Sequence, residues 1–212
     1  MVELNKHAQD ELTEEKIIGL LKDCCNGGNR VESGNSDSSL ISRSKCAAVL
    51  VPLVHTQEGW QLLLIRRTET VADHKGQVAF PGGGCEPEDH SLVETALRET
   101  MEEIGVKPDD IKVLGHLGDL MTVSNYRVAP IVGTFSWPYS FVLSTGEVSR
   151  IFTIPLAWLA NPENQETRLL NHLGQEIQVI YFKPYDGEIL WGATARMVDK
   201  LLEVLDLRQA GQ

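Results

Sequence analysis

The sequence predicts an α+β fold in which helices cover the faces of a mixed β-sheet. Segments with strand character outnumber segments with helical periodicity, and the strands follow one another in pairs instead of alternating strictly with helices. The 212 residues are 42% hydrophobic and 23% charged, which are ordinary values for a globular protein. A chain of this length buries most of the surface that its unfolded form exposes, so we expect it to fold without stabilising crosslinks.

The first 45 residues are predicted to form an appendage made of a helix and a flexible linker. Thr13 is a suitable N-cap, acidic residues follow it in the first turn, and Asn26-Gly27-Gly28 ends the helix. Residues 26–45 consist mainly of Gly, Asn, Ser and Asp, a composition typical of a linker. We therefore expect the main domain to span residues 46–208 and to stay folded when residues 1–44 are deleted.

The main domain begins where the composition changes sharply after Lys45. Apolar runs of strand length predict strands at residues 46–54, 60–65, 77–80, 111–117, 126–135, 148–154 and 177–182. Periodicity and capping signals predict helices at residues 91–104, 155–159 and 193–207. Gly105 is the stop signal of the first of these helices.

The charge of the chain limits its partners. The formal net charge is −11 and the isoelectric point is near 5.0, which argues against a nucleic-acid-binding surface built from clustered Lys and Arg. No run of about eighteen apolar residues occurs, so no membrane span is expected. The first residues lack the features of a secretory signal, and Cys24, Cys25, Cys46 and Cys85 show no regular disulfide spacing. We therefore expect a cytoplasmic protein with reduced thiols.

The main chemical signal is a concentration of acidic residues within residues 83–106. This stretch holds seven acids and a single base, a net charge of −6 against −11 for the whole chain. At about 100° per residue, Glu99, Glu102 and Glu103 share one narrow face of the predicted helix. A separate, core-facing stripe consists of Val93, Leu97, Thr100 and Ile104. Because such close carboxylates repel one another, the pattern indicates either a site for Mg²⁺ or Mn²⁺ or a solvated helix face.

Glycines immediately before this helix favour the metal site over the solvated face. Gly82-Gly83-Gly84 allows the backbone to approach a ligand closely, and a bare carbonyl can supply a further metal oxygen. Arg98 either pairs with Glu94 or Glu102 along the helix, or holds a ligating acid in orientation.

The segment that ends at Val106 is similar to the Nudix box, G-x5-E-x7-R-E-U-x-E-E-x-G-U, in which U is apolar. The chain matches this pattern at Arg98-Glu99, Glu102-Glu103, Gly105 and Val106. It departs from the pattern at Thr100, which occupies an apolar position.

The first acid of the box can be placed in two ways. Counted from Gly84, its position is occupied by His90. Counted from Gly83, it is occupied by Asp89, with one extra residue before Arg98. Asp89 with the longer spacing resembles the coenzyme A pyrophosphatase branch of the family.

The resemblance to that branch covers about residues 46–207. The matching segments are residues 63–67, 74–83, 126–133, 147–148, 154–156 and 191–195. The chain departs from the branch at Ala72, where an Arg is usual, and at Thr68, where Ser or Ala is usual. Because an Arg is missing from a phosphate-reading segment, we expect a preference for coenzyme A over dephospho-coenzyme A below about tenfold.

The resemblance implies a Nudix-type α/β/α sandwich and a hydrolase that depends on Mg²⁺ or Mn²⁺. It implies Glu99, Glu102 and Glu103 as metal ligands, together with the carbonyl of Gly83. It implies Glu102 or Glu147 as the general base, with Arg98 assisting. The residues implied in substrate binding are Arg67, His74, Lys75, Gly82 and Gly83.

The implied reaction is hydrolysis of the diphosphate linkage of coenzyme A or its derivatives to 3′,5′-ADP and 4′-phosphopantetheine. One alternative is a pyrophosphatase for ADP-ribose, dinucleotides or oxidised nucleotides. Another is a non-catalytic module that senses a nucleotide, against which the complete set of glutamates argues. The expected partner is thus a small nucleoside diphosphate derivative, and not a nucleic acid or a membrane. The sequence leaves open whether the chain is a monomer or a homodimer.

Overall fold

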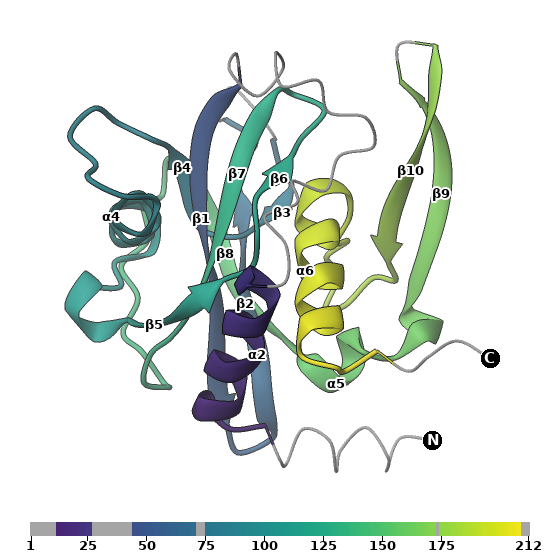
Figure 1. Ribbon diagram of the computed structural model, residues 1–212. Coiled ribbons are helices and arrows are strands. Elements are labelled where there is room, and N and C mark those ends of the chain that lie inside the picture. Colours follow the sequence, from purple (N-terminus) through teal and green to yellow (C-terminus); the bar gives the residue numbers. More distant parts are fainter. Residues whose placement is uncertain (1–11, 27–43, 71–74, 173, 209–212) are drawn as a thin grey trace.

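The computed structural model describes residues 12–26, 44–70, 75–172 and 174–208, which form three layers (Figure 1). A mixed β-sheet lies in the middle. Helix α4 (Leu92–Ile104) covers one face, and helices α2 (Glu14–Asn26) and α6 (Gly192–Val204) cover the other. The expected α+β class with a mixed sheet between helices is confirmed.

The remaining elements follow the order that the sequence predicts, with three additional strands and two additional short helical segments, η1 and η2. The strands are β1 (Lys45–Thr56), β2 (Gly59–Arg67), β3 (Val78–Ala79), β4 (Gly82–Gly84), β5 (Lys112–His116), β6 (Leu120–Met121), β7 (Tyr126–Thr134), β8 (Val148–Pro155), β9 (Gln165–His172) and β10 (Gln175–Phe182). Short helical segments are α5 (Leu156–Leu159), η1 (Pro108–Asp110) and η2 (Pro162–Asn164). The additional strands are β4, β6 and β9, which the sequence patterns do not predict.

The main sheet has the strand order β3-β2-β1-β7-β5, with β4 on β1, β6 on β7 and β8 on β2. Strands β1 and β7 run parallel, and the other pairs are antiparallel. Strands β9 and β10 form a separate hairpin that stands beside α6 (Figure 1). Within the described residues, no helix is both long and apolar enough to cross a membrane.

Strand β1 pairs with different antiparallel strands along its length, and this change places the glycine strand β4 next to helix α4. Its residues 53–56 pair with β2, whereas its residues 47–49 pair with the glycines of β4. Ala48 of β1 and Ala96 of α4 are both fully buried in one apolar cluster. Their small side chains let α4 approach the sheet closely next to β4. The glycine strand and the acidic helix therefore lie side by side.

Helix α2 is packed onto the main domain. Ile17 and Leu21 have no exposed surface and belong to the same apolar cluster as residues of β1, β2 and α6. The indole Nε1 of Trp60 donates a hydrogen bond of 2.6 Å to the backbone carbonyl of Leu12. Residues 12–26 thus supply part of the core, which argues against the expectation that the domain stays folded without residues 1–44. The domain boundary at residue 45 itself stays a prediction.

Candidate active site

Helix α4 is defined by caps at both ends, and these caps set the direction of its acidic residues. Ser91 has an extended backbone and accepts a hydrogen bond of 3.1 Å from the Glu94 N–H, as an N-cap does. Gly105 has a φ of 74° and ends the helix in the left-handed conformation that favours glycine. Thr95, Ala96, Thr100, Glu103 and Ile104 are the buried residues of the helix.

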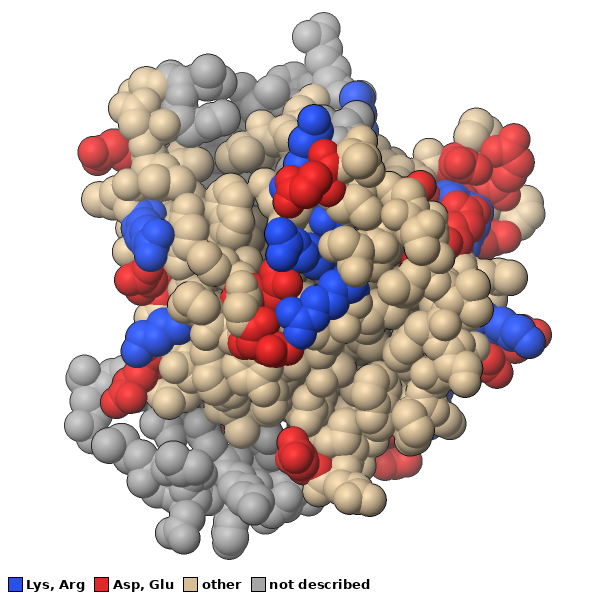
Figure 2. Space-filling view, turned by 180° about the vertical axis from the view of Figure 1, so that it is seen from behind, with Lys and Arg blue, Asp and Glu red and all other residues tan. Residues whose placement is uncertain are grey.

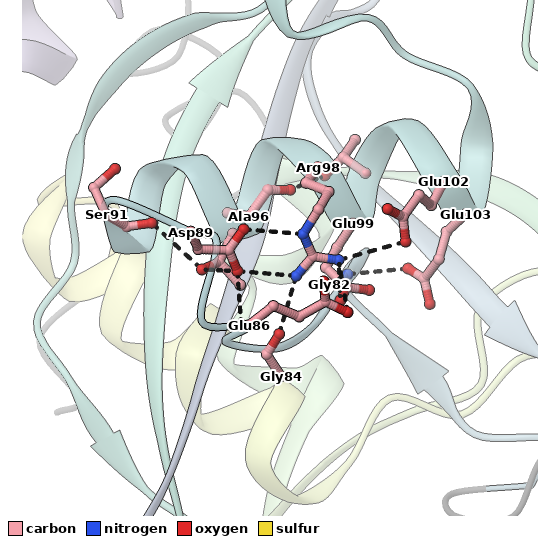
Figure 3. A network of polar contacts seen from close by, with 12 residues as sticks. Gly82, Gly84, Glu86, Asp89, Ser91, Ala96, Arg98, Glu99, Glu102 and Glu103 are labelled. Atoms are coloured by element: carbon pink, nitrogen blue, oxygen red, sulfur yellow. Dashed lines mark hydrogen bonds and ion pairs between the residues drawn. The ribbon is translucent and has the colours of Figure 1, made fainter.

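Arg98 is the centre of the polar network on this helix (Figure 3). Its Nε and Nη2 donate to the two carboxylate oxygens of Asp89, each over 3.0 Å. Its Nη2 also donates to the carbonyl of Gly84 over 3.1 Å, and its Nη1 donates to Glu99 over 2.8 Å. A weaker contact of 3.4 Å joins Nη1 to Glu102. One guanidinium therefore links the glycine strand, the following loop and the helix.

Of the two candidates for the first acid of the box, Asp89 is the one that contacts Arg98. Besides the two bonds from Arg98, its carboxylate accepts a 2.9 Å bond from the Glu86 N–H and a 2.8 Å bond from the Thr95 hydroxyl. The Arg98 hydrogen bonds, followed by that of the Glu86 N–H, hold the pKa of Asp89 well below its ordinary value. Arg98 makes this contact instead of the i,i−4 pair with Glu94, whose carboxylate accepts from the His90 N–H over 2.8 Å.

Glu103 differs from the predicted exposed stripe because it is buried, with 1% of its surface accessible. It accepts a 2.9 Å bond from Arg67 Nη1 of β2 and a 3.0 Å bond from the Gly82 N–H of β4. Burial raises the pKa of Glu103 to about 7, although the Gly82 N–H and the charge of Arg67 act in the opposite direction. The charges of Glu99 and Glu147 raise this pKa further.

Glu99 and Glu102 lie closer to the surface than Glu103. The Glu99 side chain is 16% exposed and that of Glu102 is 60% exposed. The Glu99 carboxylate lies against Gly83, since a Cβ at Gly83 would be 2.5 Å from its Cδ. Burial raises the pKa of Glu99 against the effect of Arg98, and the charges of Glu102 and Glu147 add to the increase. A side chain at position 83 would therefore displace this carboxylate from its present place.

Glu147 reaches the same region from the loop before β8. The loop is fastened at both ends, because the Ser144 N–H donates to the Glu103 carbonyl over 2.9 Å and the Thr68 N–H donates to the Glu147 carbonyl over 2.8 Å. Its charge acts on both Glu99 and Glu103, as their raised pKa values show. The loop that carries Glu147 is therefore held next to α4 and to the end of β2, in the region beside the glycine strand.

This region fits a divalent cation by its chemistry. Its donors are carboxylate and backbone carbonyl oxygens, which Mg²⁺ and Mn²⁺ prefer. The mutual repulsion of Glu99, Glu102, Glu103 and Glu147 is the electrostatic conflict that such a cation relieves. In the described part of the chain, no three acidic, His or Cys side chains already stand together in ligand geometry.

The residues expected to bind substrate have different positions. Arg67 donates a hydrogen bond to Glu103 through Nη1, and its buried Nε has no hydrogen-bond partner among the described residues. Gly82 uses its N–H for Glu103, and Gly83 lies against Glu99. Lys75 is exposed at the turn before Gly76. His74 and Ala72 are outside the described residues.

A second charged cluster, which sequence reasoning missed, lies on β2 and β8. Arg66 and Arg150 are direct cross-strand partners, and both contact the buried carboxylate of Glu188, over 3.5 Å and 3.2 Å. Glu69 and Asp186 pair with them as well. In Figure 1, β8 lies behind β1 and β7, and the view from behind shows basic and acidic side chains gathered in the middle of that face (Figure 2). Since three acids accompany two bases, the cluster is an ion-pair network and not a free anion site.

A disulfide between Cys46 and Cys85 contradicts the expectation of reduced thiols at these two positions. Gly84 lies opposite Ala47 in the β4–β1 ladder, so the next residue along β4 comes opposite Cys46. The two Cα atoms are 5.4 Å apart, within the range that a disulfide requires. The separation of 39 residues along the chain conceals this pairing from sequence inspection.

Comparisons with known proteins agree with this geometry. The family model of the NUDIX domain matches residues 44–172. An uncharacterized Nudix hydrolase NudL from Photorhabdus laumondii is 37% identical over 164 residues, which are 77% of this chain and 87% of that protein. An uncharacterized Nudix hydrolase NudL from Yersinia enterocolitica is 38% identical over 169 residues, 80% of this chain and 86% of that protein. The crystal structure of a Nudix hydrolase from M. smegmatis, RenU, has a TM-score of 0.52 at 14% identity and covers 80% of this chain and 90% of its own. That likeness concerns the fold alone.

Proposed function

The chain belongs to the Nudix family, and we propose that it hydrolyses a nucleoside diphosphate joined to a second moiety, with coenzyme A or a derivative as its substrate. The products would be 3′,5′-ADP and 4′-phosphopantetheine. The observation that carries the proposal is the position of two glutamates beside the glycine strand, where Glu99 lies against Gly83 and Glu103 accepts from the Gly82 N–H, with Arg98 fastening strand and helix together.

Glu99, Glu102 and Glu103 would hold Mg²⁺ or Mn²⁺, with the carbonyl of Gly83 as a further oxygen donor. Such an ion, when bound, neutralises diphosphate charge and lowers the pKa of a water molecule. Arg98 orients Glu99 by a 2.8 Å bond and is itself fixed by Asp89. Glu99 therefore loses little conformational freedom when it binds a ligand, as a preorganised site requires.

Residues of the chain would also accept the proton of the attacking water and bind the negative charge of the substrate. Glu102, with its exposed side chain, or Glu147, on its fastened loop, would accept the proton of the attacking water. The new P–O bond would form in line with the bond that breaks, and the leaving phosphate would take the electron pair of that bond. Arg67 contacts Glu103 through Nη1, its Nε has no partner among the described residues, and its guanidinium would bind a diphosphate oxygen.

The preference for coenzyme A rests on the sequence resemblance and on where the matching segments lie. Residues 63–67 form the end of β2, which presents Arg67 to Glu103. Residues 76–83 contain β3 and the start of β4, which presents the Gly82 N–H to the same carboxylate. The two segments that resemble the coenzyme A branch thus meet at one buried glutamate.

The test is a panel of diphosphate substrates with Mg²⁺ and Mn²⁺, in which the products are identified by mass. The panel contains coenzyme A, dephospho-coenzyme A, ADP-ribose, a dinucleotide and an oxidised nucleotide. Cleavage of coenzyme A to 3′,5′-ADP and 4′-phosphopantetheine supports the proposal. Rapid hydrolysis of ADP-ribose alone would overturn the substrate assignment and leave the pyrophosphatase chemistry. Tight nucleotide binding without turnover of any substrate would overturn the enzymatic proposal in favour of a sensor.

A further inference from the structure

We infer that the Cys46–Cys85 disulfide is a positioning crosslink for the metal-binding loop, and that its reversible reduction weakens metal binding and turnover. This inference deepens the proposed function and rests on the metal site assigned there. It concerns two residues that lie outside the Nudix box matches and that touch no substrate. They act through the backbone of β4 and through Arg98.

The first step concerns the residues just before Cys85. Gly83 packs against the carboxylate of Glu99, and the carbonyl of Gly84 accepts a 3.1 Å bond from Arg98. Both glycines are held to β1 only by the short β4 ladder, which ends at the Gly84–Ala47 pair. The disulfide, together with a 3.1 Å bond from the Cys85 N–H to the Cys46 carbonyl, closes the ladder at that end.

The second step concerns the residues just after Cys85. The Glu86 N–H donates to Asp89 over 2.9 Å, and Asp89 in turn holds Arg98 by two bonds. Glu86 is also 3.9 Å from Arg98 through its carboxylate. Arg98 therefore contacts the chain on both sides of Cys85. A covalent bond at Cys85 therefore restrains Gly84 and Glu86, the residues on either side of it that contact the Arg98 guanidinium.

The third step concerns the anchor at the other end of the bond. Cys46 lies on β1, paired with Arg127 of β7, and the next residues, Ala47 and Ala48, are buried. This is the interior of the main sheet, whereas residues 85–88 are mostly exposed. The bond thus joins an exposed loop to a strand whose neighbouring residues are buried. Without it, the Gly83 carbonyl and the Arg98–Glu99 pair have only hydrogen bonds to fix them.

The redox step needs only thiol–disulfide exchange. Both cysteines are half-buried, so a small thiolate can reach the bond. A dithiol reductant attacks one sulfur, the S–S bond breaks, and a mixed disulfide forms with release of the other cysteine thiolate. The second thiol of the reductant then displaces the first cysteine. Two electrons and two protons pass to the protein, and the reductant becomes a cyclic disulfide. A low-molecular-weight disulfide such as oxidised glutathione reverses the change.

The experiment compares the full chain after treatment with oxidised glutathione and after treatment with dithiothreitol. Mass spectrometry after alkylation of free thiols establishes the state of Cys46 and Cys85. Mn²⁺ affinity is then measured by titration in the absence of substrate, and kcat and KM are measured at subsaturating and saturating metal. We expect reduction to weaken Mn²⁺ binding about tenfold, a size typical of losing the support of a metal ligand. We expect kcat to recover largely at saturating metal.

Variants separate this crosslink from the other cysteines and from general stability. Cys46→Ser/Cys85→Ser should bind Mn²⁺ as the reduced chain does and should not respond to either reagent. Cys24→Ser/Cys25→Ser should keep the full response. Equal Mn²⁺ affinity in the oxidised and reduced chains would overturn the inference, even with a lower melting temperature after reduction, because a purely structural crosslink gives that result. Free thiols at both positions after oxidation would overturn it too. Redox-dependent Mn²⁺ binding without cleavage of any diphosphate would keep the inference and overturn the proposed function.

Discussion

Two carboxylate–arginine pairs flank the glycine strand, and their carboxylates respond to pairing in opposite ways. Asp89 pairs with Arg98 and has a pKa far below its ordinary value. Glu103 pairs with Arg67 at a similar distance, 2.9 Å, yet its pKa is raised to about 7. An arginine at hydrogen-bond distance is therefore not sufficient to keep a carboxylate strongly acidic.

The difference follows from how many donors and how many charges surround each carboxylate. Asp89 accepts from three groups: Arg98 twice, the Glu86 N–H and the Thr95 hydroxyl. Glu103 accepts one bond from Arg67 and one from Gly82, and the negative charges of Glu99 and Glu147 lie near it. Asp89 therefore stays ionised and fixes the orientation of Arg98. Ionising Glu103, in contrast, costs free energy until a cation binds.

The largest expected effect comes from removing the metal ion, because the buried charge of Glu103 in the second pair requires that ion. EDTA should reduce hydrolysis of any diphosphate substrate by at least about a hundredfold, because the repulsion among the glutamates is then unrelieved and no water is activated. Addition of Mg²⁺ or Mn²⁺ in excess of the chelator should restore turnover. Undiminished turnover in chelator and metal-free buffer would contradict the metal-dependent mechanism.

The next effect distinguishes Glu103 from Asp89 by substitution. Glu103→Gln should lower kcat/KM by about a hundredfold or more, since a ligand is lost. It should leave the chain folded but not more stable at neutral pH, because the amide oxygen can accept only one of the two bonds that Arg67 and the Gly82 N–H donate to the carboxylate. Glu94→Gln, on the exposed side of α4, is the matched control and should affect neither quantity. A loss of turnover below tenfold in a folded Glu103→Gln variant would show that Glu103 is not a ligand.

Asp89→Asn should lower stability more, and turnover less, than Glu103→Gln does. The new amide group would face the donors Arg98 and Glu86 N–H, and lost hydrogen bonds to a charged group cost about 1.5–3 kcal/mol of stability. Turnover should fall about tenfold, because Arg98 loses its support while the glutamates remain. Chemical denaturation and steady-state kinetics measure the two effects.

Glu86→Gln is the control for Asp89→Asn, since the Glu86 side chain is 58% exposed and contacts Arg98 only at 3.9 Å. It should change stability by less than about 1 kcal/mol. A folded Asp89→Asn variant with wild-type stability would contradict the assignment of Asp89 as the support of Arg98.

The sequence predicts most of the fold because its long strands are apolar and its helices carry caps. β1, β2, β7 and β8 are largely buried, so their hydrophobic runs mark them. β9 is different, because Gln165–His172 is exposed over much of its length and has no apolar alternation. β4 consists of three glycines, whose strand conformation depends on β1 and not on local propensity.

The site is predictable by residue type but not by burial. Helical periodicity places Glu103 beside Glu99, yet periodicity cannot show that β2 and β4 cover Glu103. The sequence leaves two possible positions for the first acid, and the Asp89–Arg98 contact favours Asp89. The docking of α2 and the Cys46–Cys85 bond depend equally on contacts between distant segments, which no local pattern contains.

The smallest expected effect is a difference in pH dependence between the two pairs in the metal-free protein. Asp89 has a folded pKa below its ordinary 3.8. The unfolded chain therefore binds the proton more readily, and the stabilisation from Asp89 is complete above that ordinary value and is lost as the pH falls through the folded pKa. Glu103 has a folded pKa of about 7 against an ordinary 4.5. The folded chain then binds more protons between these values, so the contribution of Glu103 to stability declines as the pH rises from about 4.5 to about 7.

Urea unfolding with EDTA present can resolve these opposite slopes through differences between variants. The stability lost in Asp89→Asn should shrink as the pH falls below the ordinary pKa of 3.8, because the unfolded wild-type chain then takes up a proton while the folded Asp89 carboxyl is still ionised. The stability of Glu103→Gln relative to wild type should instead rise between about pH 5 and about pH 7, by at most about 1.4 kcal/mol per pH unit. A stability difference between Glu103→Gln and the wild type that does not change with pH would mean that Arg67 alone compensates the buried charge. The contrast between the two pairs would then lie in geometry and not in the free energy of ionisation.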